Sequence, residues 1–284
     1  MQQFHAHGSL LLSGEYTLLH GAKALAIPTG KGQTLDLQAS DSKAIKWLAK
    51  NHLDEVIFHG NLLCEQVDLS FIDQLIQACL DSGKPLPSVN ATTTLDFDPS
   101  WGWGSSASLI ALVAQWFRVD AMWLHNQVSQ GSGYDVACAM ADGPICFQSG
   151  QTEAVDLSHW PLEHIGFIYL GNKQDSQQAV SNYLNKPADH GVIQAINELT
   201  DAMVKARTVN SLRQAINDHE HIMSDHLAMI TAKQQHFPQE AFSLKSLGAW
   251  GGDFVMALVD DPAELDYIAS SSHTHCLPWS SVAL

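Results

Sequence analysis

The stretch Asp98-Pro-Ser-Trp-Gly-Trp-Gly-Ser-Ser-Ala107 decides the interpretation of this chain. A Thr-rich strand is predicted before it, over Val89 to Phe97, and an apolar run follows it as far as Phe117. That run is too continuous for an exposed helix, so we predict a buried one. This order of strand, glycine-serine loop and helix is suited to binding a phosphate group. Glycines lack side chains that would keep the ligand from the backbone, and the free N–H groups at the helix start favour an anion.

The same loop also suits a tight turn with serine caps on a structural helix, so the segment alone leaves both interpretations open. Under the first interpretation, the Ser106 hydroxyl could be a ligand of Mg²⁺. No Gly-Lys-Ser or Gly-Lys-Thr occurs in the chain, which excludes the P-loop framework.

Two further glycine-rich loops adjoin predicted regular elements. Gly131-Ser-Gly-Tyr-Asp135 precedes a predicted helix, where Asp135 is either a first-turn carboxylate or a group that orients or accepts the proton of an attacking hydroxyl. Gly248-Ala-Trp-Gly-Gly252 precedes a predicted strand over Phe254 to Val259 and is either a hairpin turn or a backbone wall beside a ligand. Three such loops together favour a ligand site.

Composition excludes several classes of protein. The 284 residues are 45% hydrophobic, which is typical of a globular chain, and the formal charge of −16 disfavours nucleic acid as a partner. The five cysteines are odd in number and contain no C-x-x-C pair, so we expect a reducing cytoplasm. No run approaches the roughly 20 apolar residues of a membrane span, so we expect no membrane insertion.

The remaining pattern predicts an α+β protein. Strands are expected over 9–19, 24–38 and 165–170, a helix over 71–80, and a connection over 150–160. Two further helices are expected within 195–230, so a second α+β domain is predicted to start near residue 156.

In order, the loops resemble the three motifs of the galactokinase, homoserine kinase, mevalonate kinase and phosphomevalonate kinase (GHMP) superfamily. The segments that carry this resemblance are Gly8-Ser-Leu-Leu-Leu-Ser-Gly-Glu-Tyr16, Trp101-Gly-Trp-Gly-Ser-Ser-Ala107 and Leu247-Gly-Ala-Trp-Gly-Gly-Asp253. Gly133-Tyr-Asp-Val-Ala137, with Tyr169 to Ser176, resembles the bacterial branch named after its G-Y-D-I-A motif and also phosphomevalonate kinases. Gly14-Glu15 with Leu19-His-Gly21 resembles mevalonate kinases.

The resemblance implies a two-domain fold, with domains over 1–155 and 156–284. The first would contain a left-handed β-α-β unit, the second would be ferredoxin-like, and the active site would lie in the cleft between them. It also implies a cytoplasmic kinase that uses ATP and Mg²⁺ on a small-molecule alcohol or phosphorylated acceptor, and it leaves a homodimer open.

The family's functional residues can be carried over position by position. The resemblance places Asp135 on the catalytic aspartate and Ser106 on the Mg²⁺ ligand. It places the nucleotide loop on Gly102, Trp103, Gly104, Ser105, Ser106 and Ala107, and substrate binding on Gly14, Glu15, Ser176, Gly251 and Gly252.

Two positions depart from the family pattern. Ser9 stands where the family commonly has Lys, and no acidic residue lies between Trp123 and Gly131, where mevalonate kinases place a second metal-binding carboxylate. One hypothesis is that Lys173 supplies the missing positive charge as a catalytic residue; the alternative is an ordinary surface lysine.

Two histidine clusters allow a different hypothesis. His219-Glu-His221 with Asp225-His226, and His273-Thr-His275-Cys276, contain potential metal ligands. Among 15 histidines some clustering arises by chance, so structural or surface roles are favoured over metal binding.

The sequence thus predicts phosphoryl transfer from ATP to a mevalonate-pathway acceptor. Mevalonate is the first choice, because few basic residues are available for a phosphorylated substrate, and phosphomevalonate is the second. A catalytically weak nucleotide or ligand sensor on the same fold is the alternative, motivated by Ser9 in place of Lys.

Overall fold

The computed structural model describes residues 1–42, 44–63, 70–171, 176–185, 187–250, 254–271 and 275–284. Contacts divide the chain into two compact units that alternate along the sequence. The first unit is Met1–Ser9, Lys31–Pro99 and Trp103–Met140, and the second unit is Leu10–Gly30, Ser100–Gly102 and Ala141–Leu284. The predicted boundary between residues 155 and 156 stays a prediction.

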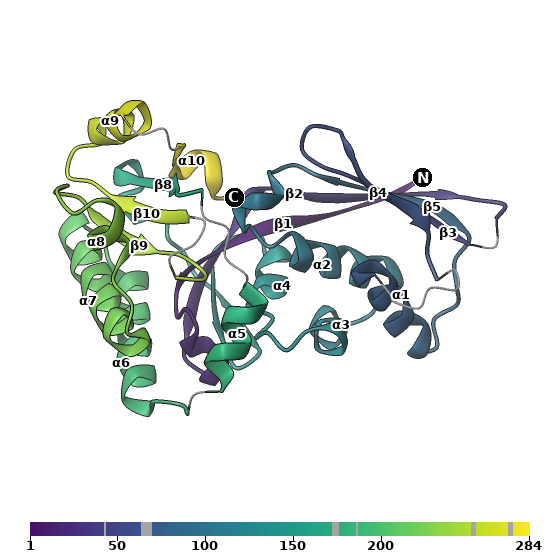
Figure 1. The fold of residues 1–284 in the computed structure, drawn as a ribbon, viewed down its shortest axis with the longest axis horizontal. Helices are drawn as coiled ribbons and strands as arrows, with labels where there is room; N and C mark the ends of the chain where they lie inside the picture. The colour runs from purple at the N-terminus through teal and green to yellow at the C-terminus, as the bar shows by residue number, and fades with distance from the viewer. Residues whose placement is uncertain (43, 64–69, 172–175, 186, 251–253, 272–274) are drawn as a thin grey trace. The chain divides into compact units, whose positions relative to one another are not determined.

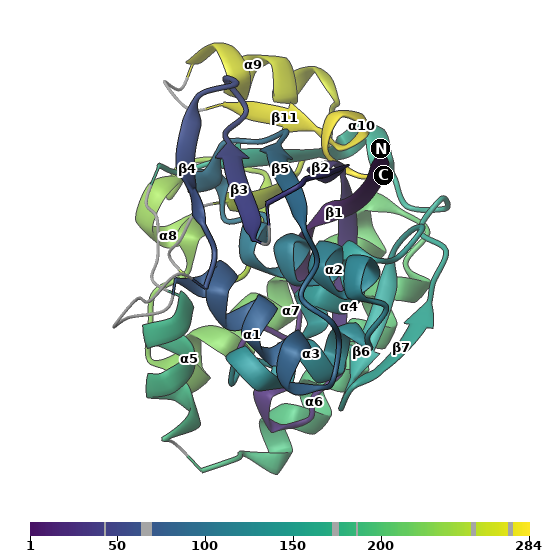
Figure 2. The same cartoon turned by 90° about the vertical axis from the view of Figure 1, so that its right-hand side faces the viewer.

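The first unit is a sheet with helices on one face, as Figures 1 and 2 show. Strand β2 pairs with β5 in antiparallel fashion, β5 pairs with β3 in parallel, and β3 forms a hairpin with β4. The strands are β1 (Gln2–Ser13) and β2 (Ala24–Ala39), which both continue into the second unit, with β3 (Ile45–Lys50), β4 (Val56–Asn61) and β5 (Val89–Leu95). The helices are α1 (Phe71–Asp81), α2 (Ser105–Phe117), α3 (Ala121–Val128) and α4 (Tyr134–Ala139), and η2 (Pro99–Trp101) begins in the first unit and continues into the second.

Helix α2 forms the centre of the first unit's core. From Ala107 to Ala114 every residue is buried, so the helix has almost no solvent face, as the continuous apolar run predicted. It packs with Leu35 and Trp47 of the strands, together with residues of α1, α3 and α4. Because close packing on all sides leaves little room to shift, the start of α2 is held in place by the core.

The second unit contains a four-stranded antiparallel sheet in the order β11-β8-β10-β9. Its strands are β8 (Ile165–Tyr169), β9 (Ser243–Ser246), β10 (Phe254–Leu258) and β11 (Cys276–Pro278), and β6 (Ile145–Gln148) and β7 (Gln151–Ala154) extend β2. Its helices are η1 (Thr17–His20), η3 (Leu162–His164), α5 (Ser176–Leu184), α6 (His190–Lys205), α7 (Val209–Leu227), α8 (Ala232–His236), α9 (Ala263–Ser271) and α10 (Trp279–Val282).

Helices α6 and α7 lie side by side, and α7 packs on β9 (Figure 1). Helix α7 begins with a capping box, in which the Thr208 hydroxyl accepts from the Ser211 N–H and the Ser211 side chain accepts from the Thr208 N–H. Its buried positions include Leu212, Ile216 and Met223. The same buried face carries the polar residues His219 and Glu220, which the next section describes.

Most predicted elements are confirmed, and two are corrected. The strand predicted over 9–19 ends at Ser13, and Thr17–His20 form the short 3-10 helix η1. The connection predicted over 150–160 is wrong for its first residues, because 145–154 form the β6–β7 hairpin. The two-residue turn places Ser149 at φ 49° and Gly150 at φ 80°, a left-handed pair that matches the twist of a hairpin. None of the helices in the described part of the chain has the length and apolarity needed to cross a membrane.

Candidate functional site

The glycine-serine loop adopts the left-handed backbone that its glycines allow. Gly102 has φ 69°, and Gly104, the N-cap of α2, has φ 74°. Ser105, Ser106 and Ala107 form the first turn of α2, whose N–H groups have no partner within the helix. These N–H groups and the positive end of the helix dipole make the loop suitable for an anion.

Gly104 is also required by its neighbour on strand β1. A Cβ atom at Gly104 would lie 2.8 Å from Ser9 Oγ, closer than real Cβ atoms approach. The Ser9 N–H donates to the Trp103 carbonyl at 3.0 Å, which ties β1 to the loop. Ser9 therefore borders the loop directly. In the superfamily that the chain resembles, this position is commonly Lys.

The loop's other side chains divide between core and solvent. Trp103 is 1% exposed and contacts Phe97, with 5.7 Å between ring centroids. Any contact between Trp103 and a ligand therefore comes from its backbone. The Ser106 side chain is exposed, so its hydroxyl is accessible to a ligand or a metal ion.

Asp135 lies in the first turn of α4, which follows the left-handed N-cap Gly133 at φ 79° and packs against α2. Its Oδ1 accepts from the Val136 N–H at 3.0 Å. The side chain keeps some exposed surface, yet it is surrounded mainly by protein, and this burial raises the pKa of Asp135 while the nearby His125 imidazole acts to lower it. A carboxylate with a raised pKa accepts a proton more readily than an ordinary aspartate.

His125 is a residue that sequence reasoning missed. It lies in α3, is 3% exposed, and its Nε2–H donates to the Gly131 carbonyl at 3.0 Å in the tautomer that this contact requires. It thereby holds the turn before Asp135. It occupies the stretch where mevalonate kinases place a carboxylate, and no sequence signal distinguishes it from the other histidines of the chain.

In the second unit, the predicted substrate residues Gly14 and Glu15 lie at the end of β1. Gly14 has φ 85°, and a Cβ atom there would lie 2.7 Å from the Lys23 carbonyl oxygen, so only glycine fits. Its N–H donates to His219 Nε2 at 3.3 Å. The Glu15 side chain is fully buried, so this carboxyl has no surface for direct contact with a ligand.

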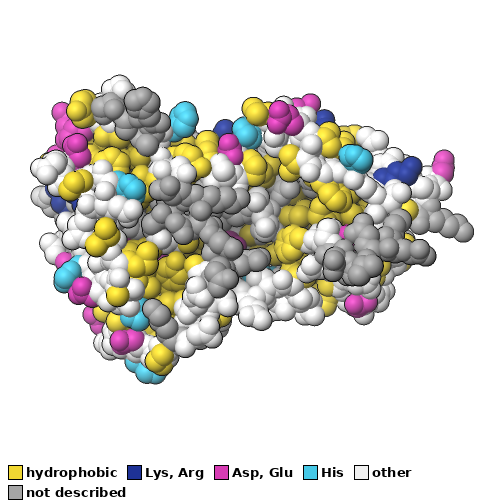
Figure 3. All heavy atoms as spheres, viewed as in Figure 1, with side chains coloured by type: hydrophobic (Ala, Val, Ile, Leu, Met, Phe, Trp, Pro, Cys, Tyr) yellow, Lys and Arg dark blue, Asp and Glu magenta, His cyan; other side chains and the backbone are white. Residues whose placement is uncertain are grey.

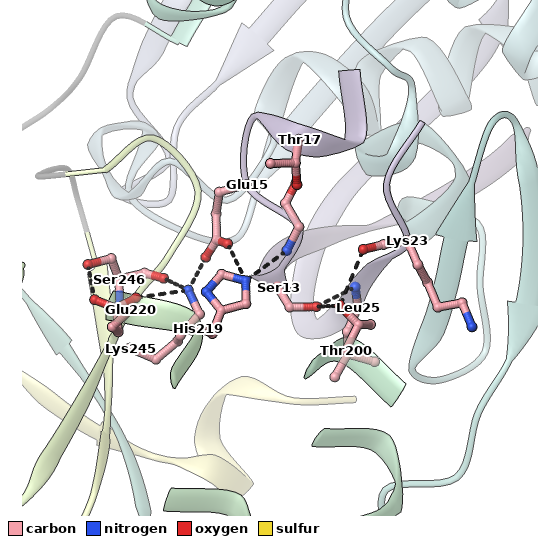
Figure 4. A network of polar contacts seen from close by, with 11 residues as sticks. Ser13, Glu15, Thr17, Lys23, Leu25, Thr200, His219, Glu220, Lys245 and Ser246 are labelled. Atoms are coloured by element: carbon pink, nitrogen blue, oxygen red, sulfur yellow. Dashed lines mark hydrogen bonds and ion pairs between the residues drawn. The ribbon is translucent and has the colours of Figure 1, made fainter. Parts of the chain in front are cut away.

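Glu15 belongs to a buried polar network, shown in Figure 4. Lys245 Nζ donates to Glu15 Oε1 and lies 3.2 Å from Glu220 Oε1, and Glu15 Oε2 lies 3.3 Å from His219 Nε2. Glu220 also accepts from the Ser246 N–H at 3.1 Å and from the Ser246 hydroxyl at 2.8 Å. Mutual pairing is what makes such buried charges tolerable.

Glu15 and His219 meet in this network as neutral groups. His219 Nε2 already accepts from Gly14, so an ionised Glu15 Oε2 would face a nitrogen lone pair. Burial raises the pKa of Glu15 from 4.5 to about 7, opposed by Lys245, and burial lowers the pKa of His219 well below 6.5. Both shifts favour a neutral Glu15 carboxyl beside a neutral His219 imidazole.

Several predicted residues lie outside the described part of the chain. Lys173, Gly251, Gly252 and His273 fall there, and their assigned roles stay predictions. Ser176 is the first residue of α5. Of the histidine clusters, His221 pairs with Asp225 at 3.7 Å on the surface, and no group of three potential ligands that could hold a metal occurs among the described residues.

The oxygen donor on the loop fits Mg²⁺ better than a softer metal. The exposed Ser106 hydroxyl would offer a hard oxygen ligand of the kind that Mg²⁺ prefers. Mg²⁺ is commonly held by one or two protein oxygens together with substrate phosphates, so a closed cage of protein ligands is not needed.

The surface in Figure 3 offers little attraction to a polyanion. On that face, Lys and Arg side chains are few and scattered among the described residues, and Asp and Glu side chains are more prominent. This agrees with the formal charge of −16.

No family model matches the chain, and no curated protein sequence matches it. Solved structures do match over nearly the whole length. A mevalonate kinase from Methanococcus jannaschii has a TM-score of 0.73 at 15% identity and covers 98% of each chain. A Streptococcus pneumoniae phosphomevalonate kinase, in complex with phosphomevalonate and AMPPNP, has a TM-score of 0.74 at 17% identity and covers 100% of this chain and 98% of that chain.

A D-glycero-D-manno-heptose 1-phosphate kinase from Bacteriodes thetaiotaomicron matches with a TM-score of 0.69 at 15% identity, covering 97% of this chain and 94% of that chain. All three structures are kinases of the GHMP superfamily. The chain therefore has the two-domain α+β fold of that superfamily, which confirms the predicted fold class and the resemblance at the level of the fold.

The Glu15 carboxyl gives the protein a specific pH dependence. Its pKa is raised on folding, so its contribution to stability is complete below pH 4.5 and is lost as the pH rises through about 7. Glu15→Gln mimics the protonated form and removes this dependence. We expect the unfolding free energy of wild type, relative to Glu15→Gln, to fall by up to about 3 kcal/mol between pH 4.5 and 8.

Urea denaturation at several pH values measures this difference, and Asp225→Asn, an exposed carboxylate on α7, is the matched control. The control should stay parallel to wild type. His219, whose pKa is lowered, loses its contribution as the pH falls below 6.5, and it does so in both proteins. A wild-type minus Glu15→Gln difference that is constant with pH would contradict the proton assignment.

Proposed function

We propose that this protein is an ATP-dependent small-molecule kinase that transfers the γ-phosphoryl group to a hydroxyl of a mevalonate-pathway acceptor, with mevalonate as the first choice. The observation that carries this proposal is the left-handed Gly104 at the start of the buried helix α2. It creates an anion-binding helix start in a chain with the fold of GHMP kinases. The complex of a similar fold with AMPPNP further supports ATP as the donor.

The loop residues would bind and orient the donor. Backbone N–H groups of Ser105, Ser106 and Ala107 would hold the phosphates, while the glycines at 102 and 104 keep the approach free of side chains. Mg²⁺, when bound by Ser106 and the phosphates, would neutralise charge on the phosphoryl oxygens. Positioning and electrostatics supply most of the catalysis in this class of reaction.

Asp135 would act on the acceptor. As the acceptor oxygen forms its bond to the γ-phosphorus, its proton passes to the Asp135 carboxylate, and the bond from the γ-phosphorus to the bridging oxygen breaks to release ADP. The raised pKa of Asp135 suits this role. His125 would hold the turn before Asp135 through its contact with the Gly131 carbonyl. It would also influence the pKa of the Asp135 carboxylate. Lys173 stays our candidate for the positive charge that Ser9 does not provide.

The acceptor would meet Gly14, Ser176, Gly251 and Gly252, with the buried Glu15 acting through the shape of the Gly14 turn. Mevalonate is favoured over phosphomevalonate because the lysines beside the Gly14 turn are already paired, Lys245 with Glu15 and Glu220 and Lys23 with Asp201. A phosphorylated acceptor would need a cation from elsewhere. Phosphomevalonate is the second candidate.

A nucleotide or ligand sensor with weak or no catalysis is the second candidate function. The observation that favours it is Ser9, which stands where the family commonly has a lysine. Ser9 lies beside the loop, because its N–H donates to the Trp103 carbonyl at 3.0 Å. Without that cation, charge on the transferring phosphoryl group is less well stabilised.

Turnover separates these candidates. Purified protein with Mg²⁺ and ATP is offered mevalonate, phosphomevalonate, homoserine and galactose in separate reactions, and ADP release is measured. We expect release that depends on mevalonate. ATP binding without release on any acceptor would favour the sensor, and absence of both would reject the kinase proposal.

Asp135→Asn tests the catalytic residue. The amide keeps the size of the side chain but cannot take up the acceptor proton, so we expect kcat to fall by roughly 100-fold or more while the Kd for ATP changes little. The exposed Asp142→Asn is the matched control and should retain wild-type kcat. A wild-type rate in Asp135→Asn would remove Asp135 from the mechanism.

A further inference from the structure

Two consecutive residues of helix α7 each hold a segment that contains, or leads along the chain to, residues assigned to the acceptor. His219 accepts from the Gly14 N–H at the end of β1, and Glu220 accepts from Ser246 at the end of β9. We propose that His219 and Glu220 are positioning residues, which fix the Gly14 turn and the segment 246–250 relative to each other and so set the affinity for the acceptor. This inference rests on the proposed kinase function.

Glu220 holds the start of the segment at two points. Both carboxylate oxygens are used, one by the Ser246 N–H at 3.1 Å and the other by the Ser246 hydroxyl at 2.8 Å. Lys245 lies 3.2 Å from the same carboxylate. Hydrogen bonds to a buried charged group are stronger and more directional than those between neutral groups, so the end of β9 has little freedom.

The other end of the segment is held by packing. The Trp250 side chain is 2% exposed and contacts Ala22, Ile196 and Met223. Tyr16, next to Gly14 and Glu15 in sequence, packs against the same apolar cluster. Segment 246–250 is therefore fixed at both ends, and at each end by groups that also hold the 14–16 turn.

Lys245 connects the two sides of the network. Its ammonium group lies between Glu15 and Glu220, as Figure 4 shows, and Glu15 in turn contacts His219. Residues i and i+1 of a helix point about 100° apart, which lets His219 and Glu220 reach two different segments from one helix. Helix α7 packs on both α6 and β9, so it is a rigid support for both contacts.

Stability alone does not explain this network. Replacing buried ion pairs with apolar side chains of similar volume is often neutral or stabilising, because the charges lose their hydration. Directional hydrogen bonds to a charged group, such as those from Ser246 to Glu220, do however select a single geometry, which apolar packing does less strictly. Four ionisable groups, all under 5% exposed, here connect the 14–16 turn with segment 246–250, as a positioning role requires.

The test uses Glu220→Gln and the milder Ser246→Ala, which keeps the backbone hydrogen bond. In the full protein, we expect Glu220→Gln to raise KM for the acceptor by roughly fivefold or more, the effect of losing one charged hydrogen bond, with KM for ATP unchanged. Ser246→Ala should have a smaller effect in the same direction. The double variant should be less than additive, because both changes act on the same contact. Asp225→Asn is the matched control on α7.

Hydrogen exchange gives a readout independent of turnover. Peptides that cover 246–250 and 12–16 should exchange faster in Glu220→Gln than in Asp225→Asn, while peptides of α2 stay unchanged. If acceptor KM is unchanged, or if only kcat falls in proportion to the folded fraction, the positioning role is rejected. Unchanged exchange at 246–250 rejects it even if wild type shows no kinase activity, an outcome that would reject the proposed function separately.

Discussion

The buried start of helix α2 is the constraint on which the proposed chemistry depends. Because α2 is enclosed by strands and helices on nearly every side, its first turn is held in one place. Gly104 then directs the backbone into that turn, and the contact with Ser9 leaves no room for a side chain. An anion-binding site made from backbone N–H groups requires this rigidity, since the groups must be oriented before the ligand arrives.

In the second unit, buried charged groups hold two loop segments in place. The segments at 14–16 and 246–250 are short and each contains a glycine with positive φ, so polar contacts supplement the packing of Trp250 in fixing them. The network of Glu15, His219, Glu220 and Lys245 holds them with paired hydrogen bonds. Lys245 pairs with both carboxyl groups, and a neutral Glu15 beside a neutral His219 leaves Lys245 and Glu220 as the charged pair.

The sequence predicted the local elements more fully than the contacts between them. The apolar run after Gly104 predicted a buried helix, and the order of three loops led to the fold that the solved structures share. Lys245, Glu220 and His125 were missed, because each is an ordinary polar residue whose role arises only when distant segments meet. Glu15 was assigned to substrate binding from its motif alone, and the structure shows a fully buried carboxyl. The β6–β7 hairpin was missed because its turn, Ser149-Gly150, is followed by polar residues without an apolar alternation.

The most direct test of the central claim is hydrogen exchange of the glycine-serine loop, with and without a non-hydrolysable ATP analogue and Mg²⁺. If backbone N–H groups at 104–107 hold the phosphates, their exchange slows on addition of the analogue, while peptides on the exposed strand β4 exchange at the same rate. Binding of the analogue that leaves exchange at 104–107 unchanged, or that protects another segment instead, would contradict the account.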